Sequence, residues 1–312
     1  MTGTIKTIFL FLVFPGFLFV ATVGLLAGWV DRKVTARLQW RVGPPWYQNF
    51  MDIAKLFYKE TLVPEGASKA MFLGMPVLAL VCATLMSTVV LVVNARPNTG
   101  FLGDFIVILY LSIIPSIALM LGGFLSGNPL ANLGSSREMK LVLSYELPFI
   151  LASLVPVIKS GYSIRIGDIL RHQLNNGAFI VSPSGFFAFL VCILAIQAKL
   201  GFVPFDVAEA ETEITCGPYI EYSGKSLGVW KLAKAILMVG LPALLVTVLW
   251  AGCGTGIRGL LGGIAKYVVV LVLLIVIKNT NPRVRIDHAL KFFWGIVTGL
   301  AIISVLLALL GS

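Results

Sequence analysis

Long apolar runs are the feature that most constrains this chain. Eight mainly apolar stretches follow one another along its 312 residues, and the segments between them carry most of the charges. A helix needs about 20 apolar residues to cross the hydrocarbon core of a bilayer, so the longer stretches can each span a membrane. The stretches are 5–30, 71–95, 102–126, 141–158, 185–200, 231–251, 264–279 and 290–310, of which 141–158 and 185–200 are short or interrupted.

These runs predict an all-α membrane protein with about eight transmembrane helices. A β-barrel is disfavoured, because its strands would alternate between apolar and polar residues. Only 12% of the residues are charged, about half the usual share for a soluble domain, which excludes a soluble globular protein. We therefore expect a single polytopic membrane domain over residues 1–312.

Basic residues are distributed unevenly between the loops. Of the 24 Lys and Arg residues, 17 lie in the segments after the first, third, fifth and seventh stretches or in the adjoining end turn of a flanking stretch. The positive-inside rule then predicts that these odd loops are cytoplasmic and that both termini lie outside the cell membrane. The same rule explains the net charge of +10 without a nucleic-acid partner. Acids contribute little to orientation, yet 11 of the 14 lie in the odd loops, so we interpret the inner face as the functional one.

Cysteine and histidine are sparse and scattered. Cys82, Cys192, Cys216 and Cys253 show no disulfide or metal-binding spacing, and small buried side chains explain them. The two histidines fall in loops that are predicted on opposite sides of the membrane. We therefore expect no metal, haem or other cofactor on this chain.

The first inner loop contains an amphipathic segment, 49–60. Phe50, Ile53, Ala54 and Phe57 have the spacing of one helical face, whereas Asp52, Lys55 and Lys59 lie opposite. Such a helix would lie flat in the membrane interface. Two interpretations stay open: a simple membrane-surface helix, and a platform that receives a soluble partner.

The third inner loop holds five carboxylates within 16 residues, namely Asp206, Glu209, Glu211, Glu213 and Glu221. Part of this pattern is typical of a helix start, with Asp206 as N-cap and Glu209 as its N3 partner. In such a helix Asp206, Glu209 and Glu213 would share a face. Carboxylates crowded beside a membrane raise one another's pKa, which suits groups that handle protons. We predict proton or ion coupling here, with a solvated acidic face as the alternative.

A further acid, Glu146, falls inside the fourth stretch, where a carboxylate by default marks an ion or proton path. A misplaced helix boundary is the alternative for Glu146. Glu138 lies at the mouth of this stretch, where an ion pair with Arg137 or Lys140 would also explain it. In the last inner loop, Arg283 and Arg285 precede Asp287, and these arginines could neutralise the acidic loop or anchor to lipid headgroups.

Together these motifs resemble the membrane-anchor subunit of respiratory complex I and of energy-converting, membrane-bound nickel–iron hydrogenases. The third loop carries the most specific match, in Phe205-Asp206, Glu209-Ala210-Glu211 and Glu221-Tyr222-Ser223-Gly224. The remaining matches are spread over most of the chain: Arg41-Val42-Gly43-Pro44, Asp52, Lys55, Lys59-Glu60, Ser136-Arg137-Glu138-Met139, Glu146, Arg283, Arg285 and Asp287.

The resemblance implies a non-catalytic subunit at the joint between a soluble electron-transfer arm and a membrane arm. Its partners would be hydrophilic hydrogenase-like large and small subunits on the cytoplasmic side, with antiporter-like and small membrane subunits beside it. Iron–sulfur clusters, and nickel–iron in a hydrogenase, would sit on the soluble subunits. Coupling to proton or sodium transport would involve Glu138, Glu146, Asp206, Glu209, Glu211, Glu213 and Glu221. The soluble arm would dock at Arg37, Arg41, Asp52, Lys55 and Lys59.

Two positions favour the hydrogenase branch or its sulfur-reducing relatives. Quinone-reducing members usually read Ala-Glu-Thr-Asn-Arg-x-Pro-Phe-Asp where this chain has Lys199 in place of the glutamate and Phe202 in place of the arginine. The terminal acceptor, whether protons or sulfane sulfur, stays open. The alternatives are the quinone-chamber subunit of complex I and a stand-alone secondary transporter. The transporter is disfavoured, because no internal repeat is visible.

Overall fold

Long helices make up most of the chain in the computed structural model, which describes residues 9–254 and 256–311. Seven helical segments are long and apolar enough to cross a membrane, and the shorter apolar helix α8 (Pro183–Lys199) joins them. In a membrane a helix satisfies every backbone polar group within its own segment, so apolar runs of this length fold as helices. The seven segments are Phe9–Leu38, Lys69–Ala95, Asp104–Leu125, Pro129–Lys159, Gly224–Leu249, Gly256–Thr280 and Ile286–Leu309.

These helices confirm the predicted fold class. The spanning elements are α2 (Phe17–Leu38), α4 (Lys69–Ala95), α5 (Asp104–Leu125), α6 (Pro129–Lys159), α8, α10 (Gly224–Leu249), α11 (Gly256–Thr280) and the pair α12 (Ile286–Lys291) and α13 (Thr298–Leu309). A π-helical turn, η4 (Phe292–Val297), joins α12 to α13. The short elements are α3 (Gln48–Tyr58), η1 (Pro97–Thr99), α7 (Ile166–Asn176), η2 (Phe179–Val181), α9 (Glu211–Ile214) and η3 (Gly217–Tyr219). The predicted first stretch, 5–30, begins in residues outside the described part.

The fourth span differs from its prediction. It was expected over 141–158 and interrupted, but α6 is one helix of 31 residues that starts at Pro129. Pro129 at the first helical position and the Asn128 side chain, which accepts a hydrogen bond from the Leu130 N–H, start the helix earlier. Glu138 therefore lies within α6 rather than at its mouth.

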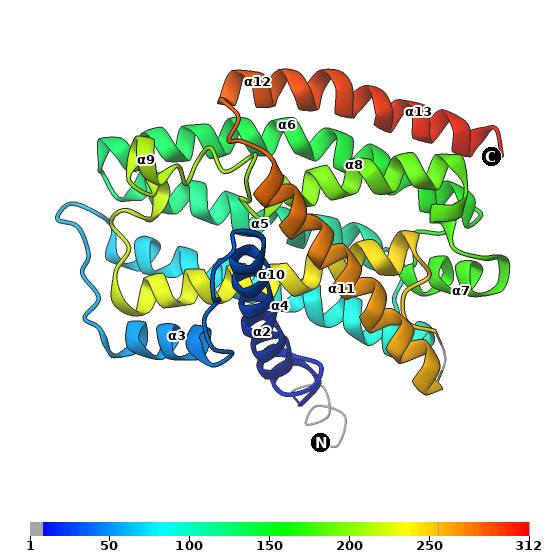
Figure 1. The fold of residues 1–312 in the computed structure, drawn as a ribbon, viewed down its shortest axis with the longest axis horizontal. Helices are drawn as coiled ribbons and strands as arrows, with labels where there is room; N and C mark the ends of the chain where they lie inside the picture. The colour runs from blue at the N-terminus through cyan, green and yellow to red at the C-terminus, as the bar shows by residue number, and fades with distance from the viewer. Residues whose placement is uncertain (1–8, 255, 312) are drawn as a thin grey trace.

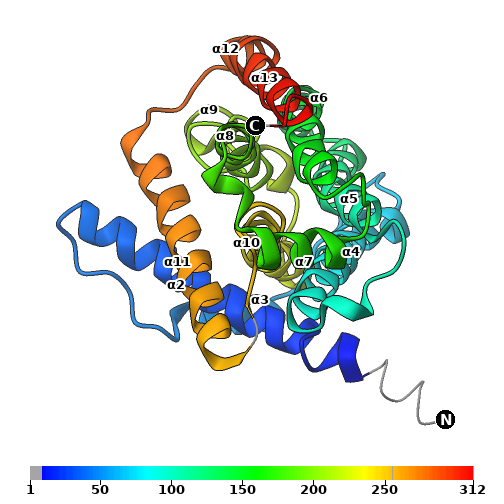
Figure 2. The same ribbon diagram turned by 90° about the vertical axis from the view of Figure 1, so that its right-hand side faces the viewer.

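Helix α10 forms the centre of the bundle. In its most apolar window 83% of the residues are buried, against 28% for α11. Figures 1 and 2 show α4, α5, α6, α8, α10 and α13 running roughly side by side, whereas α2 and α11 cross them obliquely. At Gly24 of α2 an added Cβ would meet the Ala235 carbonyl oxygen at 2.4 Å, so the missing side chain lets α2 approach α10 closely.

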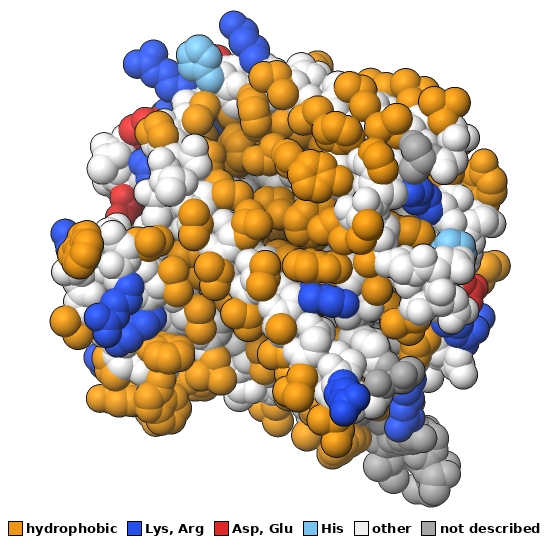
Figure 3. Space-filling view, turned by 45° about the vertical axis from the view of Figure 1, so that its right-hand side comes forward, with side chains coloured by type: hydrophobic (Ala, Val, Ile, Leu, Met, Phe, Trp, Pro, Cys, Tyr) orange, Lys and Arg blue, Asp and Glu red, His pale blue; other side chains and the backbone are white. Residues whose placement is uncertain are grey.

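The outer helices present apolar surface. Figure 3 shows a face on which hydrophobic side chains cover most of the surface. Residues of α11 and α13 are among the exposed large apolar side chains, such as Leu261, Val269, Ile303 and Leu306. In water such a surface would be an association site, but it suits contact with lipid tails or with neighbouring membrane helices.

The odd loops meet at one end of the bundle. The first loop contacts the third through a hydrogen bond from the Leu62 N–H to the Ser223 hydroxyl, 3.0 Å long. The second odd loop reaches the third where the Asn128 amide donates to Glu221 at 2.6 Å, and the last does so through Arg283 and Asp206. The alternation of sides that was predicted from the charges is therefore present, while the cytoplasmic assignment of this end stays a prediction.

The predicted amphipathic helix is α3. Its apolar face packs on the chain itself, because Gly228 of α10 faces Leu56 and Phe57. The Asn49 side chain is buried and donates to the Leu25 carbonyl oxygen of α2 at 2.8 Å. Helix α3 is thus held between α2 and α10 at the end where the odd loops meet (Figure 1).

Candidate functional site

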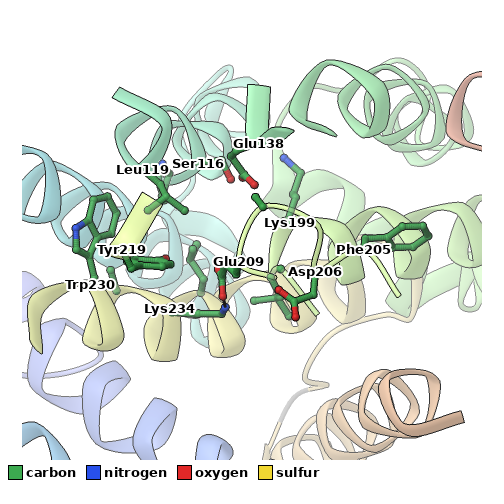
Figure 4. A pocket seen from close by; sticks show the side chains of 16 residues that line it. Ser116, Leu119, Glu138, Lys199, Phe205, Asp206, Glu209, Tyr219, Trp230 and Lys234 are labelled. Atoms are coloured by element: carbon green, nitrogen blue, oxygen red, sulfur yellow. Dashed lines mark hydrogen bonds and ion pairs between the residues drawn. The ribbon is translucent and has the colours of Figure 1, made fainter. Parts of the chain in front are cut away.

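Charged side chains form a connected group that leads from this end of the bundle into its interior. We call it the inner charge cluster, and Figure 4 shows its central part. Each of its carboxylates except Glu138 makes an ion pair with a cation on another element. The members are Glu213, Arg137, Asp206, Arg283, Glu209, Lys234, Glu138, Lys199 and Glu146.

The third loop is not the helix that its acids suggested. Residues 206–210 are irregular apart from a turn at 208–209, and α9 is only the four residues Glu211–Ile214, so the predicted cap at Asp206 and the shared helical face are wrong. The backbone is held by other segments instead: the Val284 N–H donates to the Pro204 carbonyl oxygen at 3.0 Å. Its acids pair with cations on three different elements, which one helical face could not reach.

The outermost pair joins Glu213 to Arg137 of α6, with 2.7 Å between carboxylate and guanidinium. Arg137 therefore serves Glu213, not Glu138 as the ion-pair alternative had it. Its guanidinium lowers the pKa of the exposed Glu213 carboxyl. Desolvation acts in the opposite direction on this pKa, but the arginine outweighs it.

Asp206 pairs with Arg283 of the last loop at 2.7 Å, and Arg283 also donates to the Thr212 hydroxyl at 3.2 Å. Arg283 therefore pairs with one acid of this loop, as expected if it neutralises the loop. Burial raises the pKa of Asp206, although the positive charges of Lys234 and Arg283 oppose the shift. The other oxygen, Oδ1, is buried and has no hydrogen-bond partner among the described residues.

Glu209 binds Lys234 of α10 through both carboxylate oxygens, at 2.9 and 2.6 Å. Burial again raises the pKa of Glu209, and Lys234 works against it. The predicted rise in pKa is thus present at Asp206 and Glu209, with burial as its main cause rather than mutual repulsion.

A cavity of about 40 Å³ lies in the middle of the cluster. Glu138, Lys199, Asp206, Glu209 and Lys234 all line it (Figure 4). One water needs roughly 10–15 Å³ of such space, so the cavity has room for a few waters that could bridge these groups. Waters in this space would lie between carboxylates that do not touch.

Deepest in the cluster, Glu146 binds Lys199 at 2.7 Å. Glu146 lies well within α6, which rules out the misplaced helix boundary that could have explained it. The Lys199 side chain is only 1% exposed, and its ammonium group also donates to the Ser112 hydroxyl at 3.1 Å. The unusual lysine at position 199 is therefore matched by a carboxylate from α6.

The other predicted site residues lie around this cluster at the same end. Glu211 is exposed at the start of α9, and Glu221 accepts the Asn128 amide hydrogen bond. Asp52 pairs with Arg32 at 2.9 Å. The remainder lie at the surface, exposed or partly exposed: Arg37, Arg41, Lys55, Lys59, Arg285 and Asp287.

Sequence reasoning missed Lys234 and the pairing role of Lys199. Both are ionisable side chains in or at the end of apolar stretches, and that signal alone could have marked them. It also missed Ser112 and Ser116, which nothing in the sequence sets apart from other helix serines. Among the described residues no group of three or more His, Cys, Asp and Glu side chains could hold a metal ion.

Comparison with known proteins places this geometry in a family. A sequence profile described as NADH dehydrogenase matches residues 9–309. The chain belongs to the NADH dehydrogenase family. Similar family members include an NADH-quinone oxidoreductase subunit of Geobacillus kaustophilus (strain HTA426), 30% identical over 92% of this chain and 87% of that protein. The corresponding protein of Brevibacillus brevis (strain 47 / JCM 6285 / NBRC 100599) is 32% identical over 89% of this chain and 85% of its own length.

A solved structure shares the fold closely. It is a chain of the membrane-bound sulfane sulfur reductase, an archaeal respiratory membrane complex, with a TM-score of 0.82 and 26% identity over 94% of this chain and 96% of that one. The relatives are thus subunits of multi-subunit respiratory complexes, which argues against a stand-alone transporter. With its apolar helices, the chain is an integral membrane protein.

Proposed function

We propose that this chain is the membrane-anchor and coupling subunit of a multi-subunit respiratory oxidoreductase. The observation that carries the proposal is the inner charge cluster, which runs from the exposed Glu213 to Glu146 inside α6. Ionisable groups inside a membrane protein are costly and by default serve ion or proton movement. The cluster would couple electron transfer in a soluble arm to proton or sodium transport.

The soluble arm would dock at the end where the odd loops meet. Trp40 is 98% exposed and Tyr58 92% exposed there, although both are large and partly apolar. Aromatic side chains are enriched in protein interfaces, and Arg37, Arg41, Lys55 and Lys59 surround them with positive charge. We therefore place the hydrophilic large and small subunits at this end, which would face the cytoplasm with both termini outside.

The arm would carry the cofactors, with iron–sulfur clusters and, in a hydrogenase, nickel–iron on its subunits. Reduction there would change the charge next to the third loop and draw a proton toward Asp206 and Glu209. Burial already raises their pKa values and so favours their protonated forms. The change would pass through the cavity to Glu138 and Glu146, and from there to antiporter-like membrane subunits.

Lys199 and Phe202 favour the hydrogenase or sulfur-reducing branch. Lys199 is neutralised by Glu146, and Phe202 is buried under the Lys278 ammonium group, 4.7 Å from the ring centroid. Both replacements are therefore built into the interior rather than tolerated at a surface. Proton reduction to hydrogen, or reduction of sulfane sulfur or polysulfide, would follow at the partner's site.

The quinone-reducing alternative has support of its own. The named sequence relatives are quinone oxidoreductase subunits, and a cavity of about 260 Å³ lies between α2, α3 and α10, lined by Asp31, Asp52 and Phe202 among others. Purifying the complex through a tag on this chain and assaying hydrogen evolution, sulfane reduction and quinone reduction decides between the branches. Quinone reduction alone would exclude the hydrogenase and sulfur-reducing branches.

Coupling is tested at Glu213. We expect Glu213→Gln to abolish redox-driven ion transport in membrane vesicles while the complex still assembles, because the outermost carboxylate of the cluster is lost. The matched control is Glu65→Gln, which removes an exposed acid of the first loop that makes no ion pair among the described residues. Normal ion gradients at normal turnover in Glu213→Gln would exclude this residue from coupling.

A further inference from the structure

Lys199 lies near two carboxylates of α6, Glu146 and Glu138, in the interior of the bundle. It is bound to Glu146, and it lines the same cavity as Glu138 (Figure 4). Glu138 is 7% exposed and takes part in none of the ion pairs among the residues that the structure describes. The other buried ammonium group at the cavity, Lys234, is held by both oxygens of Glu209. Lys199 contacts only one oxygen of Glu146, so it is held by fewer ionic contacts than Lys234.

The side chains around Lys199 outline a path between the two carboxylates. Ser112 and Ser116 lie one turn apart on the same face of α5. Ser112 accepts from Lys199 at 3.1 Å, while Ser116 accepts from the Tyr145 hydroxyl at 3.2 Å and lines the same cavity as Glu138. The lysine stem is long and flexible, so its ammonium group can turn from one serine toward the other.

Two aromatic rings stabilise the cation along this path. The Lys199 ammonium nitrogen lies 4.5 Å from the ring centroid of Phe149 and 5.4 Å from that of Tyr145. An aromatic face attracts a cation without fixing it to one hydrogen-bond direction. Glu146 also keeps a buried oxygen, Oε1, that has no hydrogen-bond partner among the described residues. That oxygen is free to take a proton when the lysine leaves.

We propose that Lys199 is an exchangeable counter-ion that pairs alternately with Glu146 and Glu138. The inference rests on the proposed coupling function and assigns it a moving part. When Glu138 releases its proton to cavity water, Lys199 turns toward the new carboxylate. Glu146, left without a cation, then takes up a proton from water. Glu138 loses one proton and Glu146 gains one. Lys199 stays protonated, and its positive charge moves from Glu146 to Glu138, opposite to the direction of the proton.

Infrared difference spectroscopy of the purified, intact complex tests this exchange. Spectra of the reduced minus the oxidised complex would record the carbonyl stretch of each protonated carboxyl. We expect one band to disappear, from Glu138, and one to appear, from Glu146. Glu146→Gln should remove both bands, because Lys199 then has only Glu138 as a partner and keeps it ionised in both states. Glu138→Gln should also remove both, because without its carboxylate the lysine has no reason to move.

Lys199→Arg is the variant that keeps the charge and the fold. Its guanidinium can bind Glu146 with two parallel hydrogen bonds, which holds the partner in place. We expect the Glu146 band and redox-driven ion transport to be lost together. A Glu146 band that persists in Glu138→Gln or Lys199→Arg would overturn the exchange. If ion transport also stays normal in Lys199→Arg, the proposed function stands without the lysine exchange. Absence of redox-driven ion transport in the unmodified complex would overturn the proposed function itself.

Discussion

The buried pair of Lys199 and Glu146 makes a quantitative prediction about stability. Lys199→Met keeps a long, flexible side chain but removes the ammonium group, which leaves Glu146 without a counter-ion in a site where its side chain is 13% exposed. Removing one partner of a buried ion pair costs about 3–5 kcal/mol, because the remaining group must either hold an uncompensated charge or bind a proton. The single variant should therefore be strongly destabilised.

Two comparisons separate this electrostatic cost from lost packing. In the double variant Lys199→Met/Glu146→Gln no charge remains, so most of the stability should return, since neutral replacement of a whole buried pair is often nearly neutral. The matched control is Arg32→Met, which breaks a pair whose side chains are 48% and 30% exposed. An exposed pair contributes only about 0–1 kcal/mol, so this change should be mild.

The assay is thermal unfolding of the purified complex under one fixed condition, compared as apparent Tm. We expect Lys199→Met to have the lowest Tm, with the double variant and Arg32→Met close to the unmodified protein. The reasoning is refuted if Lys199→Met is no less stable than Arg32→Met. It is equally refuted if the double variant is less stable than the single one.

Three further predictions concern the loops. In Gly134→Ala the new Cβ would lie 2.7 Å from Gly217 Cα, so we expect the free energy of unfolding to fall by about 1–3 kcal/mol. The third loop should pack more loosely, which is measured as faster proteolysis. The control is Gly74→Ala, which has open space around it and should be neutral. Asn49→Ala removes the buried hydrogen bond to the Leu25 carbonyl and should cost about 1–3 kcal/mol, seen as faster hydrogen exchange in α3; unchanged exchange would contradict the role of Asn49. Infrared titration should find Asp206 and Glu209 ionising above the ordinary carboxyl range and Glu213 below it. Because their pKa values are raised, Asp206 and Glu209 lower the stability of the fold as pH rises through their titration. Glu213 has a lowered pKa, so its contribution to stability is lost as pH falls through its titration. Equal midpoints for all three would show that burial and Arg137 do not set them.

The sequence predicted the helices well because membrane spans are fixed by local composition. All eight stretches overlap their helices, although the first ends eight residues before α2 does and the stretches for α10 and α11 begin seven and eight residues late. The amphipathic segment 49–60 corresponds to α3. The start of α6 was missed, since residues 129–140 are too polar to read as a span. They are helical because the segment is capped at Asn128 and packs against the third loop, where Gly134 faces Gly217 and Pro218.

The candidate site was predicted in its residues but not in its geometry. The acids of the third loop were identifiable because carboxylates are rare in this chain. Their arrangement was not, since tertiary pairs with Arg137, Lys234 and Arg283 override the local preference for a capped helix. Each of these cations lies far from its acid in sequence. Single-chain patterns therefore reveal which charges are present, whereas only the packed bundle determines which of them meet.

The central claim, that the inner charge cluster couples electron transfer to ion movement, is tested most directly in proteoliposomes that contain the purified complex. The double variant Lys199→Met/Glu146→Gln suits the measurement, because it is expected to stay folded while it lacks both ionisable groups deepest in the cluster. Electron transfer and the ion gradient are recorded in the same vesicles, beside the unmodified complex. The account predicts continued electron transfer with the gradient lost. A full gradient at the normal rate of electron transfer would contradict it.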